Sequence, residues 1–470
     1  MSERTKMAPP EGWVPARLSR EGPRYRAIIT ALQSDIEEGR LPPGSRLLPH
    51  RELADRLGVS VGTVSKAYAE AEQMGLIIGK VGSGTFVRSL APGLAAGGEG
   101  EAAQVSLSLN VPPPGRYVEA LLGALAQLRN PQLLGHLFDY LPHEGLPAHR
   151  EAAALWMAAG DYRPAPADVL ICHGAQHAAS LAVRALLDPG APLLAECLTY
   201  SGVKALARHQ GVSLVGVAID EEGLIPEALA EACARTGARL LYTMPTLHSP
   251  TAAVMGAARR RAIAEIVERH DLRVIEDNVY GFLHPDAPPP LAQLLPDRVF
   301  YVTSLSKCVA PGLRVGFVVT PPAFRERMIL GLRATAWMAT PAMVELGVRM
   351  LADGTIGRLV HERRIEARAR LDLARSVLAG HLGALPGDAP AGFHLWLPLP
   401  ADWPAARFFL AARQHGVTVT PPDAVVVDAR SPNGVRLCLG NPASRAELQG
   451  ALSVLRELIE TAPPPALSVV

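Results

Sequence analysis

The sequence predicts a multi-domain protein with a small, mainly helical N-terminal unit and a larger α/β domain, which combines a mostly parallel sheet with a smaller α+β lobe. Three observations support this. The chain of 470 residues is long enough for two or three domains. The stretch SLAPGLAAGGEGEAAQ is rich in small residues and has no periodic apolar positions, as in flexible linkers. After it, apolar runs such as VLICHG, RVIEDN and VFYVTS alternate with alanine-rich helical stretches, a pattern typical of α/β domains.

These patterns set the expected domain boundaries. After about residue 345 the sequence shows a helix, short strands (HLWLPL, TVTP, VRLCLG) and an amphipathic closing helix, which predicts the smaller lobe. The expected parts are a tail at 1–21, a helix-turn-helix unit at 22–88, a flexible linker at 89–110, and an α/β domain at 111–470, with a large lobe at about 141–345 and a small lobe at about 111–140 plus 346–470.

Composition excludes several classes of protein. The formal net charge is +1, and residues 1–90 carry 13 Lys and Arg against 10 Asp and Glu, so charge alone does not indicate a nucleic-acid partner. The N-terminal stretch MSERTKMAPPEGW has no apolar core for a signal peptide, and no apolar run is long enough for a membrane helix. We therefore expect a cytoplasmic protein that does not enter a membrane. No CxxC pair occurs among the cysteines, which argues against disulfides and zinc: Cys172, Cys197, Cys233, Cys308 and Cys438.

The N-terminal unit carries the signals of a helix-turn-helix. A first helix ends at Gly39, and a Pro-Pro-Gly turn leads to a short helix at 50–57, closed by Gly58. Ser60 can cap a second helix from residue 61 to about 74. The following GLIIGKVGSGTFV contains two β-rich runs around a Gly-Ser-Gly turn, which predicts a hairpin, and so a wing. An alternative interpretation is a small helical bundle with an unrelated hairpin.

The order of these blocks resembles the winged-helix domain of GntR-type regulators, which has similar RLPPGxRLPxxRELA, SxxTVxxAY and GSGTFV segments. The resemblance implies binding of double-stranded operator DNA by a dimer on two half-sites. It also implies that arginines reach the DNA, that the second helix reads it, and that wing glycines let the backbone approach. The implied DNA-binding residues are Arg46, Arg51, Ser60, Thr63, Lys66, Gly82 and Gly84.

The stretch VFYVTSLSKCVAPGLRVGFVVT places Lys307 and Arg314 between two strand-like apolar runs. A charge there is costly unless an anion or a covalent partner meets it. A reactive lysine must be a neutral amine, and pyridoxal phosphate offers both an aldehyde for a lysine and a phosphate for an arginine. The segment resembles the lysine-bearing segment of fold type I aminotransferases. That resemblance implies Lys307 as the Schiff-base lysine and Arg314 as a phosphate ligand, with Ser304 and Ser306 as hydroxyl donors. The alternative is a strand-end lysine and a surface arginine.

Other segments add to this constellation. In RVIEDNVYGFL, an apolar strand ends at Asp277, where a carboxylate would keep a pyridine nitrogen protonated, and Tyr280 could donate to the cofactor's phenolic oxygen. A helix cap is the alternative role for the acid. In VLICHGAQHAASL, a strand and a glycine turn precede a helix, so the amides of Ala175 and Gln176 would face a phosphate.

Three further residues follow from the same resemblance. APLLAECLTYSG places Tyr200 where the family has its ring-stacking aromatic residue, and FDYLPHEGLPAHR places Tyr140 where a tyrosine crosses to the partner subunit's phosphate. GVRLCLGNPAS resembles the segment whose arginine binds the substrate carboxylate, here Arg436. The whole chain resembles the MocR branch of GntR regulators, where a winged helix is fused to an aminotransferase-like domain in a head-to-tail homodimer.

One departure from the family bears on activity. In MPTLHSPTAAVM, Ser249 stands where the family motif PTxxNPTG has an asparagine that binds the phenolic oxygen. Serine is shorter, so we expect Tyr280 alone, or water, to make this hydrogen bond. Whether the protein retains full transaminase turnover stays open.

Two other patterns allow different interpretations. Ser304 and Lys307 also fit the SxxK of serine acyl enzymes, but the chain lacks the SDN element those enzymes need. His173 and His177 have helical metal-ligand spacing but no third ligand at a telling distance, so we expect no metal site.

The function expected from the sequence is a cytoplasmic, dimeric transcriptional regulator that holds pyridoxal phosphate as an aldimine on Lys307 and senses an amino compound, or the cofactor itself. Two alternatives stay open: a pyridoxal-phosphate-dependent aminotransferase with an accessory DNA-binding domain, and a regulator whose cofactor site has lapsed. Whether a residual or half-reaction transaminase activity survives also stays open. The sequence leaves the effector, the operator and the direction of regulation undetermined.

Overall fold

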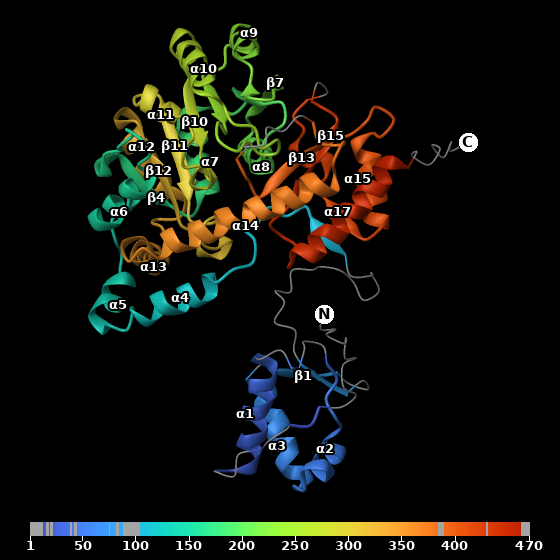
Figure 1. Ribbon diagram of the computed structural model, residues 1–470. Coiled ribbons are helices and arrows are strands. Elements are labelled where there is room, and N and C mark those ends of the chain that lie inside the picture. The colour runs from blue at the N-terminus through green and yellow to red at the C-terminus, as the bar shows by residue number, and fades with distance from the viewer. Residues whose placement is uncertain are drawn as a thin grey trace. The chain divides into compact units, whose positions relative to one another are not determined.

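The chain forms two compact units, Met1–Glu101 and Ala102–Val470 (Figure 1). The structure is a computed structural model and describes residues 13–15, 18, 22–37, 40–41, 45–74, 76–80, 84–87, 104–383, 390–428 and 431–461. Most of the expected tail, Gly39, Gly82 and residues 89–103 of the expected linker lie outside the described residues.

The first unit is a winged helix-turn-helix, as predicted. Its helices are α1 (Arg24–Glu37), α2 (His50–Leu57) and α3 (Val61–Gln73). Gly58 ends α2 with φ 62°, a left-handed conformation that glycine adopts without strain. Ser60 caps α3, because its Oγ accepts a hydrogen bond from the Thr63 amide at 3.2 Å. The three helices share a core that includes Ile28, Leu53 and Val64.

A hairpin follows α3. Strands β1 (Ile77–Lys80) and β2 (Gly84–Val87) pair antiparallel, and the edge of β2 also bonds the chain before α2, where the Leu47 amide donates to Thr85 O at 2.8 Å. The wing is therefore tied to the helical core through backbone hydrogen bonds.

The second unit is built on a seven-stranded sheet in the order β4-β12-β11-β10-β9-β5-β6. Only β12 runs antiparallel to its neighbours in this sheet, so the predicted mostly parallel sheet is confirmed. The strands are β4 (Val169–Cys172), β5 (Pro192–Glu196), β6 (Ser213–Val217), β9 (Leu240–Thr243), β10 (Arg273–Asp277), β11 (Val299–Ser304) and β12 (Gly316–Val319).

Helices bury both faces of this sheet, which explains why its strands read as continuous apolar runs. Successive residues of β4 show the alternation, since Val169 and Ile171 join one core cluster and Leu170 joins the other. The helices around the sheet are α6 (Pro147–Met157), α7 (Ala175–Leu186), α8 (Ser201–Gln210), α9 (Pro226–Thr236), α10 (Ala257–Arg269), α11 (Leu291–Leu294), α12 (Arg325–Thr335) and α13 (Pro341–Ala352). We call this sheet with its helices the large lobe.

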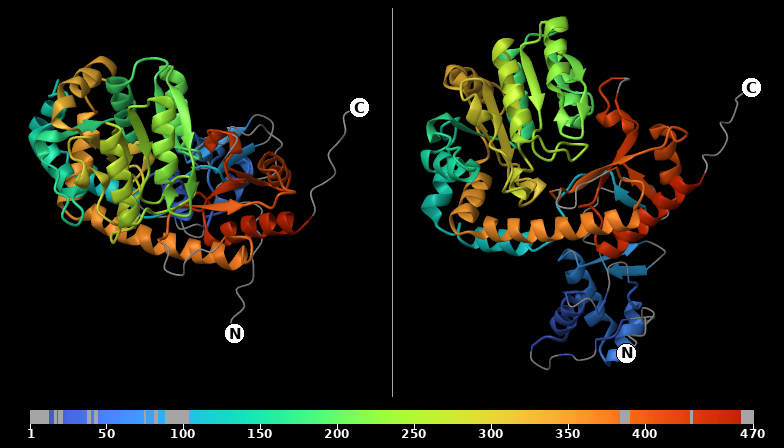
Figure 2. Two further views of the ribbon diagram at one scale, coloured as in Figure 1. Left: turned by 90° about the horizontal axis from the view of Figure 1, so that it is seen from above. Right: turned by 45° about the horizontal axis from the view of Figure 1, so that its top comes forward.

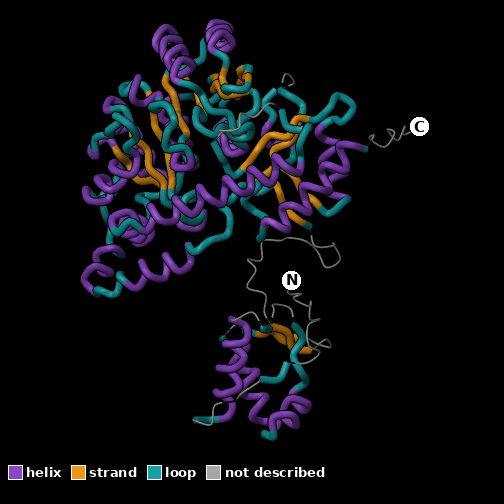
Figure 3. Tube along the Cα trace, in the orientation of Figure 1, coloured by secondary structure: helices purple, strands orange, loops and turns teal. Residues whose placement is uncertain are grey.

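The small lobe combines short sheets with helices. Strands β13 (His394–Pro398) and β15 (Gly434–Cys438) pair antiparallel, and β14 (Val417–Val419) pairs parallel with β3 (Val105–Leu107). Its helices are α15 (Ala405–Gln414), α16 (Pro422–Val425) and α17 (Arg445–Glu460). The long helix α14 (Thr355–Val377) joins the two lobes (Figure 2), and Figure 3 shows their separate groups of strands.

Short elements complete the second unit. They are α4 (Tyr117–Ala126), α5 (Pro131–Leu137), β7 (Ile219–Asp220), β8 (Gly223–Leu224) and the 3-10 turns η1 (Pro166–Asp168), η2 (Gly281–Leu283), η3 (Pro311–Leu313) and η4 (Pro322–Phe324). Among the described residues, no helix combines the length and the apolar character that crossing a membrane requires.

Two expected boundaries differ from the structure. The flexible linker was expected to reach residue 110, but β3 begins at Val105 and pairs with a strand more than 300 positions later. Residues 111–140 were expected in the small lobe, whereas Ala124 of α4 and Leu137 of α5 lie in the same core cluster as Val344 of α13. Sequence patterns show that an amphipathic element buries a face but not which lobe it packs on, which is why these assignments failed.

Candidate functional site

A cavity lies at the carboxyl ends of the parallel strands. This is where ligands bind in open α/β sheets. The cavity is lined by every residue that the sequence analysis predicts to bind the cofactor from within the same chain. Tyr140 is predicted to act on the partner subunit's site instead. The cavity is lined by Ala175, Gln176, Tyr200, Met244, Ser249, Asp277, Val279, Tyr280, Ser304, Ser306, Lys307, Pro311 and Arg314.

Lys307 lies just beyond β11 and lines the cavity. Its Nζ donates to the backbone oxygen of Asn110 at 2.5 Å and lies 5.8 Å from the centre of the Tyr280 ring. Burial disfavours the charged ammonium and lowers the pKa of Lys307 to about 8. A larger share of this lysine is therefore a neutral amine near neutral pH than of an exposed lysine.

Asp277 ends β10 and is almost fully buried. Tyr242 donates to its Oδ2 at 2.7 Å, and the Val279 amide donates to its Oδ1 at 3.2 Å. Burial outweighs these hydrogen bonds and raises the pKa of Asp277 to about 6. The two hydrogen bonds fix the orientation of the carboxylate. Because burial disfavours its negative charge, a positively charged partner would stabilise the ionised form.

The opposite end of the cavity is suited to an anion. Helix α7 begins at Ala175, so its free backbone amides and the positive end of its dipole face this region. Arg314 adds a guanidinium, whose Nη2 donates to His173 O at 3.0 Å. Gly174 makes this approach possible, because a Cβ built there would lie 2.7 Å from Arg314 Nη2. Arg314 itself adopts φ 52°, a strained conformation of the kind found at binding sites.

Hydroxyl groups and an amide complete this end. Ser304 and Ser306 are buried beside Lys307. The Gln176 side chain donates to Gly202 O at 2.8 Å, and Tyr200 lies at the start of α8, where it lines the same cavity. The predicted residues that line the cavity therefore come from the ends of five strands, β4, β5, β9, β10 and β11, or from the segments that follow them.

Arg436 projects from β15 of the small lobe and is 6% exposed. Its guanidinium donates to three neutral oxygens, Thr420 Oγ1 at 3.1 Å, Ser249 Oγ at 3.0 Å and Ser108 O at 3.1 Å. Ser249, the departure from the family motif, is therefore a hydrogen-bond partner of the carboxylate-binding candidate. Arg436 does not line the cavity directly, but it reaches it through Ser249.

Sequence reasoning missed three residues of the site. Asn110 lies in the stretch expected to be linker, yet its Nδ2 donates to Tyr280 OH at 2.7 Å and lies 3.0 Å from His394 Nδ1. His394 comes from β13, and Tyr242 from β9 holds Asp277. The available signals were weak: Asn110 precedes a stiff Val-Pro-Pro-Pro run, and Tyr242 lies near the end of an apolar strand.

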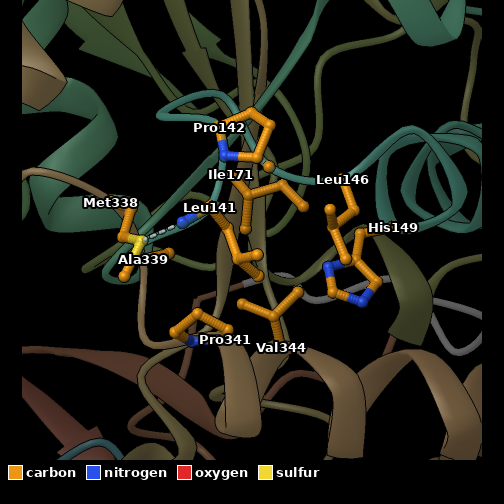
Figure 4. A pocket seen from close by; sticks show the side chains of 10 residues that line it. Leu141, Pro142, Leu146, His149, Ile171, Met338, Ala339, Pro341 and Val344 are labelled. Atoms are coloured by element: carbon orange, nitrogen blue, oxygen red, sulfur yellow. Dashed lines mark hydrogen bonds between the residues drawn. The ribbon is translucent and has the colours of Figure 1, made fainter. Parts of the chain in front are cut away.

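Tyr140 does not line the cavity of its own chain. It is 79% exposed and its ring packs edge-on to Trp337, with 5.7 Å between ring centres. The adjoining segment is anchored in a separate small hollow, where the Leu141 amide bonds Met338 Sδ (Figure 4). Apolar groups and His149 line that hollow, and the His149 ring bonds Glu345 Oε2 at 2.8 Å.

The histidine pair behaves as a structural feature. The His173 ring nitrogen Nε2 bonds Met338 O at 3.0 Å, and His177 Nε2 bonds Thr335 Oγ1 at 2.9 Å. Burial lowers the pKa of His177 to about 4. Among the residues that the structure describes, no group of three or more potential metal ligands occurs.

The expected DNA-binding residues lie in the first unit and are mostly exposed. Arg51 is exposed on α2, and Arg46 lies beside the wing, with its Nε 3.1 Å from the Cβ position of Gly84. Ser60 serves as the cap of α3, and its Oγ also bonds Thr63 Oγ1 at 2.9 Å. Lys66 places its Nζ 4.2 Å from the centre of the Tyr25 ring, a cation–π contact within the unit. These contacts give Ser60, Thr63 and Lys66 structural roles beside any role toward DNA.

Comparisons with known proteins assign both units to families. Residues 104–455 match the family "Aminotransferase class I and II", and residues 24–87 match "Bacterial regulatory proteins, gntR family". The chain is 31% identical to the uncharacterized HTH-type transcriptional regulator YdeF of Bacillus subtilis over 456 residues, covering 96% of this chain and 97% of that one. It is 28% identical to the vitamin B6 salvage pathway transcriptional repressor PtsJ of Salmonella typhimurium, covering 89% and 95%.

A solved structure agrees with the second family. The α-aminoadipate aminotransferase LysN of Thermus thermophilus, complexed with N-(5'-phosphopyridoxyl)-L-leucine, superposes with a TM-score of 0.69 at 25% identity, covering 76% of this chain and 92% of that one. The expected aminotransferase-like fold of the second unit is thereby confirmed.

Proposed function

Because the chain belongs to the aminotransferase class I and II family and carries a GntR-family domain in front, as MocR-type regulators do, we propose that its second unit is a pyridoxal phosphate sensor. The molecule as a whole is a helix-turn-helix transcriptional regulator of this kind. In this proposal Lys307 holds the cofactor, an amino compound or the cofactor itself is the signal, and double-stranded operator DNA is the target.

One observation carries the proposal: three chemically different groups converge on one cavity, and each matches one group of pyridoxal phosphate. The partly neutral amine of Lys307 suits the aldehyde, the buried Asp277 suits the ring nitrogen, and Arg314 with the start of α7 suits the phosphate. A strand-end lysine with an unrelated surface arginine would not be expected to share a cavity with such an acid.

When bound, the cofactor supplies an aldehyde that reacts with amines and a ring that withdraws electrons. The protein's part is to hold, orient and tune it. Asp277 would keep a proton on the ring nitrogen, because a buried carboxylate gains from a positively charged neighbour. Ser304, Ser306 and the α7 amides would donate to phosphate oxygens, and Tyr280 to the phenolic oxygen.

The effector class follows from Arg436. Its guanidinium is buried and donates to neutral oxygens, so a carboxylate would add the counter-charge and a two-pronged hydrogen bond. An amino acid offers both a carboxylate for Arg436 and an amine for the cofactor on Lys307. We therefore propose an amino acid as the preferred form of the amino-compound effector.

We also propose a head-to-tail homodimer. Helix α4 exposes Val118, Leu122 and Leu125 at helical spacing, 53%, 62% and 47% exposed respectively. Phe138 and Tyr140, which follow α5, are each 79% exposed. Exposed apolar groups of this size favour a protein partner, and a second copy would let Tyr140 of one protomer reach the other's phosphate. A dimer would also bring two winged helices to two half-sites.

A second candidate function is aminotransferase activity. Its support is that Lys307, Asp277, Tyr280 and Arg436 stand in segments that resemble the ones the family uses for catalysis. Repeated recovery of the starting visible spectrum after addition of a keto acid would demonstrate turnover. A spectrum that changes once and then stops would indicate a sensor or a half-reaction.

The visible spectrum tests the proposal directly. Protein saturated with pyridoxal phosphate should absorb visible light, and borohydride treatment followed by mass spectrometry should place the pyridoxyl mass on the Lys307 peptide. Lys307→Ala should abolish both signals, whereas Lys204→Ala, at a lysine outside the cavity, should leave both intact. Wild-type protein without visible absorbance would refute the cofactor sensor and leave a DNA-binding protein with a lapsed site.

A further inference from the structure

Asn110 contacts three groups at the heart of the cavity, although it lies beyond the end of β3 rather than on a strand of the large sheet. Its backbone oxygen accepts from Lys307 Nζ at 2.5 Å. Its side-chain Nδ2 lies 2.7 Å from Tyr280 OH and 3.0 Å from His394 Nδ1. The same residue therefore contacts the amine that would carry the cofactor and the hydroxyl that would face its phenolic oxygen.

The direction of these hydrogen bonds follows from His394. Its Nε2 lies 2.9 Å from the backbone oxygen of His248, and because a carbonyl oxygen can only accept, Nε2 must carry the hydrogen. His394 is 1% exposed, and burial lowers its pKa to about 3, so its ring is neutral. Nδ1 of His394 is therefore a bare acceptor.

This acceptor orients the amide of Asn110. The NH₂ group, not the oxygen, must face His394 Nδ1, and its second hydrogen then points to the Tyr280 oxygen. Tyr280 is 3% exposed, and burial raises its pKa, so its hydroxyl stays protonated. An oxygen that already accepts from Asn110 directs its own hydrogen elsewhere, and Tyr280 lines the cavity.

The residue at position 249 explains why such an arrangement is useful. Ser249 stands where the family has its amide, it is shorter than asparagine, and its Oγ accepts from Arg436 Nη1 of the small lobe at 3.0 Å. Asn110 Oδ1 is buried and has no hydrogen-bond partner among the described residues, a cost that proteins tend to retain at functional sites.

We propose that Asn110 is a positioning residue that makes Tyr280 a one-way hydrogen-bond donor to the phenolic oxygen of pyridoxal phosphate, and so compensates for the family amide absent at position 249. The inference rests on the proposed cofactor function. Asn110 acts through Tyr280 and needs no contact with the cofactor itself.

Asn110→Ala tests the side chain alone, because alanine keeps the backbone oxygen that accepts from Lys307. The matched control is Asn441→Ala. That asparagine donates to Ser106 O at 2.8 Å, so the substitution also loosens the β3 segment. Among the described residues, no hydrogen bond joins it to Tyr280 or Lys307. Both variants are made in the full chain. The readouts are the dissociation constant of pyridoxal phosphate and the pH midpoint of the visible band.

We expect Asn110→Ala to weaken cofactor binding about three- to tenfold, the effect of one hydrogen bond. A bond donated to the phenolic oxygen competes for the proton that this oxygen shares with the Lys307 nitrogen, so its loss should raise the pH midpoint by about half a unit to one unit. Asn441→Ala should stay within about twofold of wild type in affinity, because it breaks no bond to the cofactor's partners.

A double-mutant cycle separates action through Tyr280 from general loosening. With Tyr280→Phe as the background, Asn110→Ala should add almost nothing to either readout. If Asn110→Ala does not fold, Asn110→Leu keeps the side-chain size without donors and should give the same shifts.

Three outcomes decide the matter. Wild-type affinity and midpoint in both Asn110 variants would overturn the inference, as would equal effects of Asn110→Ala with and without the Tyr280 hydroxyl. Wild-type protein that takes up no pyridoxal phosphate would refute the proposed function and this inference together, a result recognisable before any variant is compared.

Discussion

The cavity of the second unit and the helices α2 and α3 of the first unit present their polar side chains in opposite ways. In and next to the cavity, the side chains of Lys307, Asp277 and Arg436 are largely buried and hydrogen-bonded to partners from several elements. Along α2 and α3, Arg51 and Lys66 are exposed and belong to a small helical unit. Burial makes each cavity contact strong and specific, because an unpaired buried group is costly, whereas exposed charges act at long range and are screened by salt. Substitutions should therefore have large, ligand-specific effects in the cavity and small, salt-dependent effects on the helices.

The largest effect is expected at Arg436. Arg436→Ala should weaken binding of an amino acid about 100-fold, the loss expected for a charge-assisted hydrogen bond to its carboxylate. The measurement is a visible-spectrum titration of cofactor-loaded protein with L-leucine and with 3-methylbutylamine, the same molecule without the carboxylate. The amine should bind wild type and variant alike. Equal losses for both ligands would remove the carboxylate role from Arg436.

The next effect concerns pH. Burial lowers the pKa of Lys307 to about 8, and only the neutral amine reacts with an aldehyde. The rate of pyridoxal phosphate uptake should therefore rise about tenfold per pH unit well below pH 8 and level off above it. Stopped-flow absorbance measures this rate, with free lysine as the comparison. An uptake rate still rising at pH 10 would mean that the cavity leaves the amine unperturbed.

A smaller effect is expected at the DNA-binding surface. Arg51→Ala should weaken binding several-fold to DNA that the wild-type protein selects from a random library, and lower the salt-dependence slope by about one. The visible spectrum should not change. Arg56→Ala is the control, because that guanidinium is held 2.8 Å from Glu52 on the same helix. An Arg56 variant that binds as poorly as the Arg51 variant would contradict the assignment of Arg51.

The smallest effect is expected in the wing. Gly84 has φ 110°, and a Cβ there would lie 3.1 Å from Arg46 Nε, so Gly84→Ala should destabilise the first unit by about 1 kcal/mol. Hydrogen exchange of the β1 and β2 amides reports this directly. Gly62→Ala is the control, since its Cβ would approach only Ser60 Oγ, at 3.8 Å. Similar exchange in the two variants would show that the wing tolerates a side chain.

Sequence patterns were most successful for residues that belong to a single local motif at the end of one strand. The neighbourhoods of Lys307, Asp277 and Ala175 each contain an apolar strand followed by a polar residue or a helix start, and parallel strands gather such ends at one edge. The helix-turn-helix was predictable for the same reason, because its caps, Gly58 and Ser60, act within a few residues.

Contacts between distant segments were not predictable in this way. Asn110 meets Tyr280 from 170 positions away, and Ser249 meets Arg436 from 187. No local periodicity or helix cap marks such a pair. The composition therefore places Asn110 in a linker, and the sequence shows Ser249 only as a replacement of the family's asparagine, not as a partner of Arg436. The lobe assignment of α4 failed for the same reason, since its apolar face shows that it packs but not on what.

The early position of β3 has a practical consequence for anyone who separates the two units. A fragment cut at residue 111, where composition alone would place the start of the second unit, loses the strand that pairs with β14 and the carbonyls that face Lys307 and Arg436. A fragment that begins at Gln104 retains all of them. Limited proteolysis or expression trials of the isolated second unit should therefore aim upstream of that glutamine.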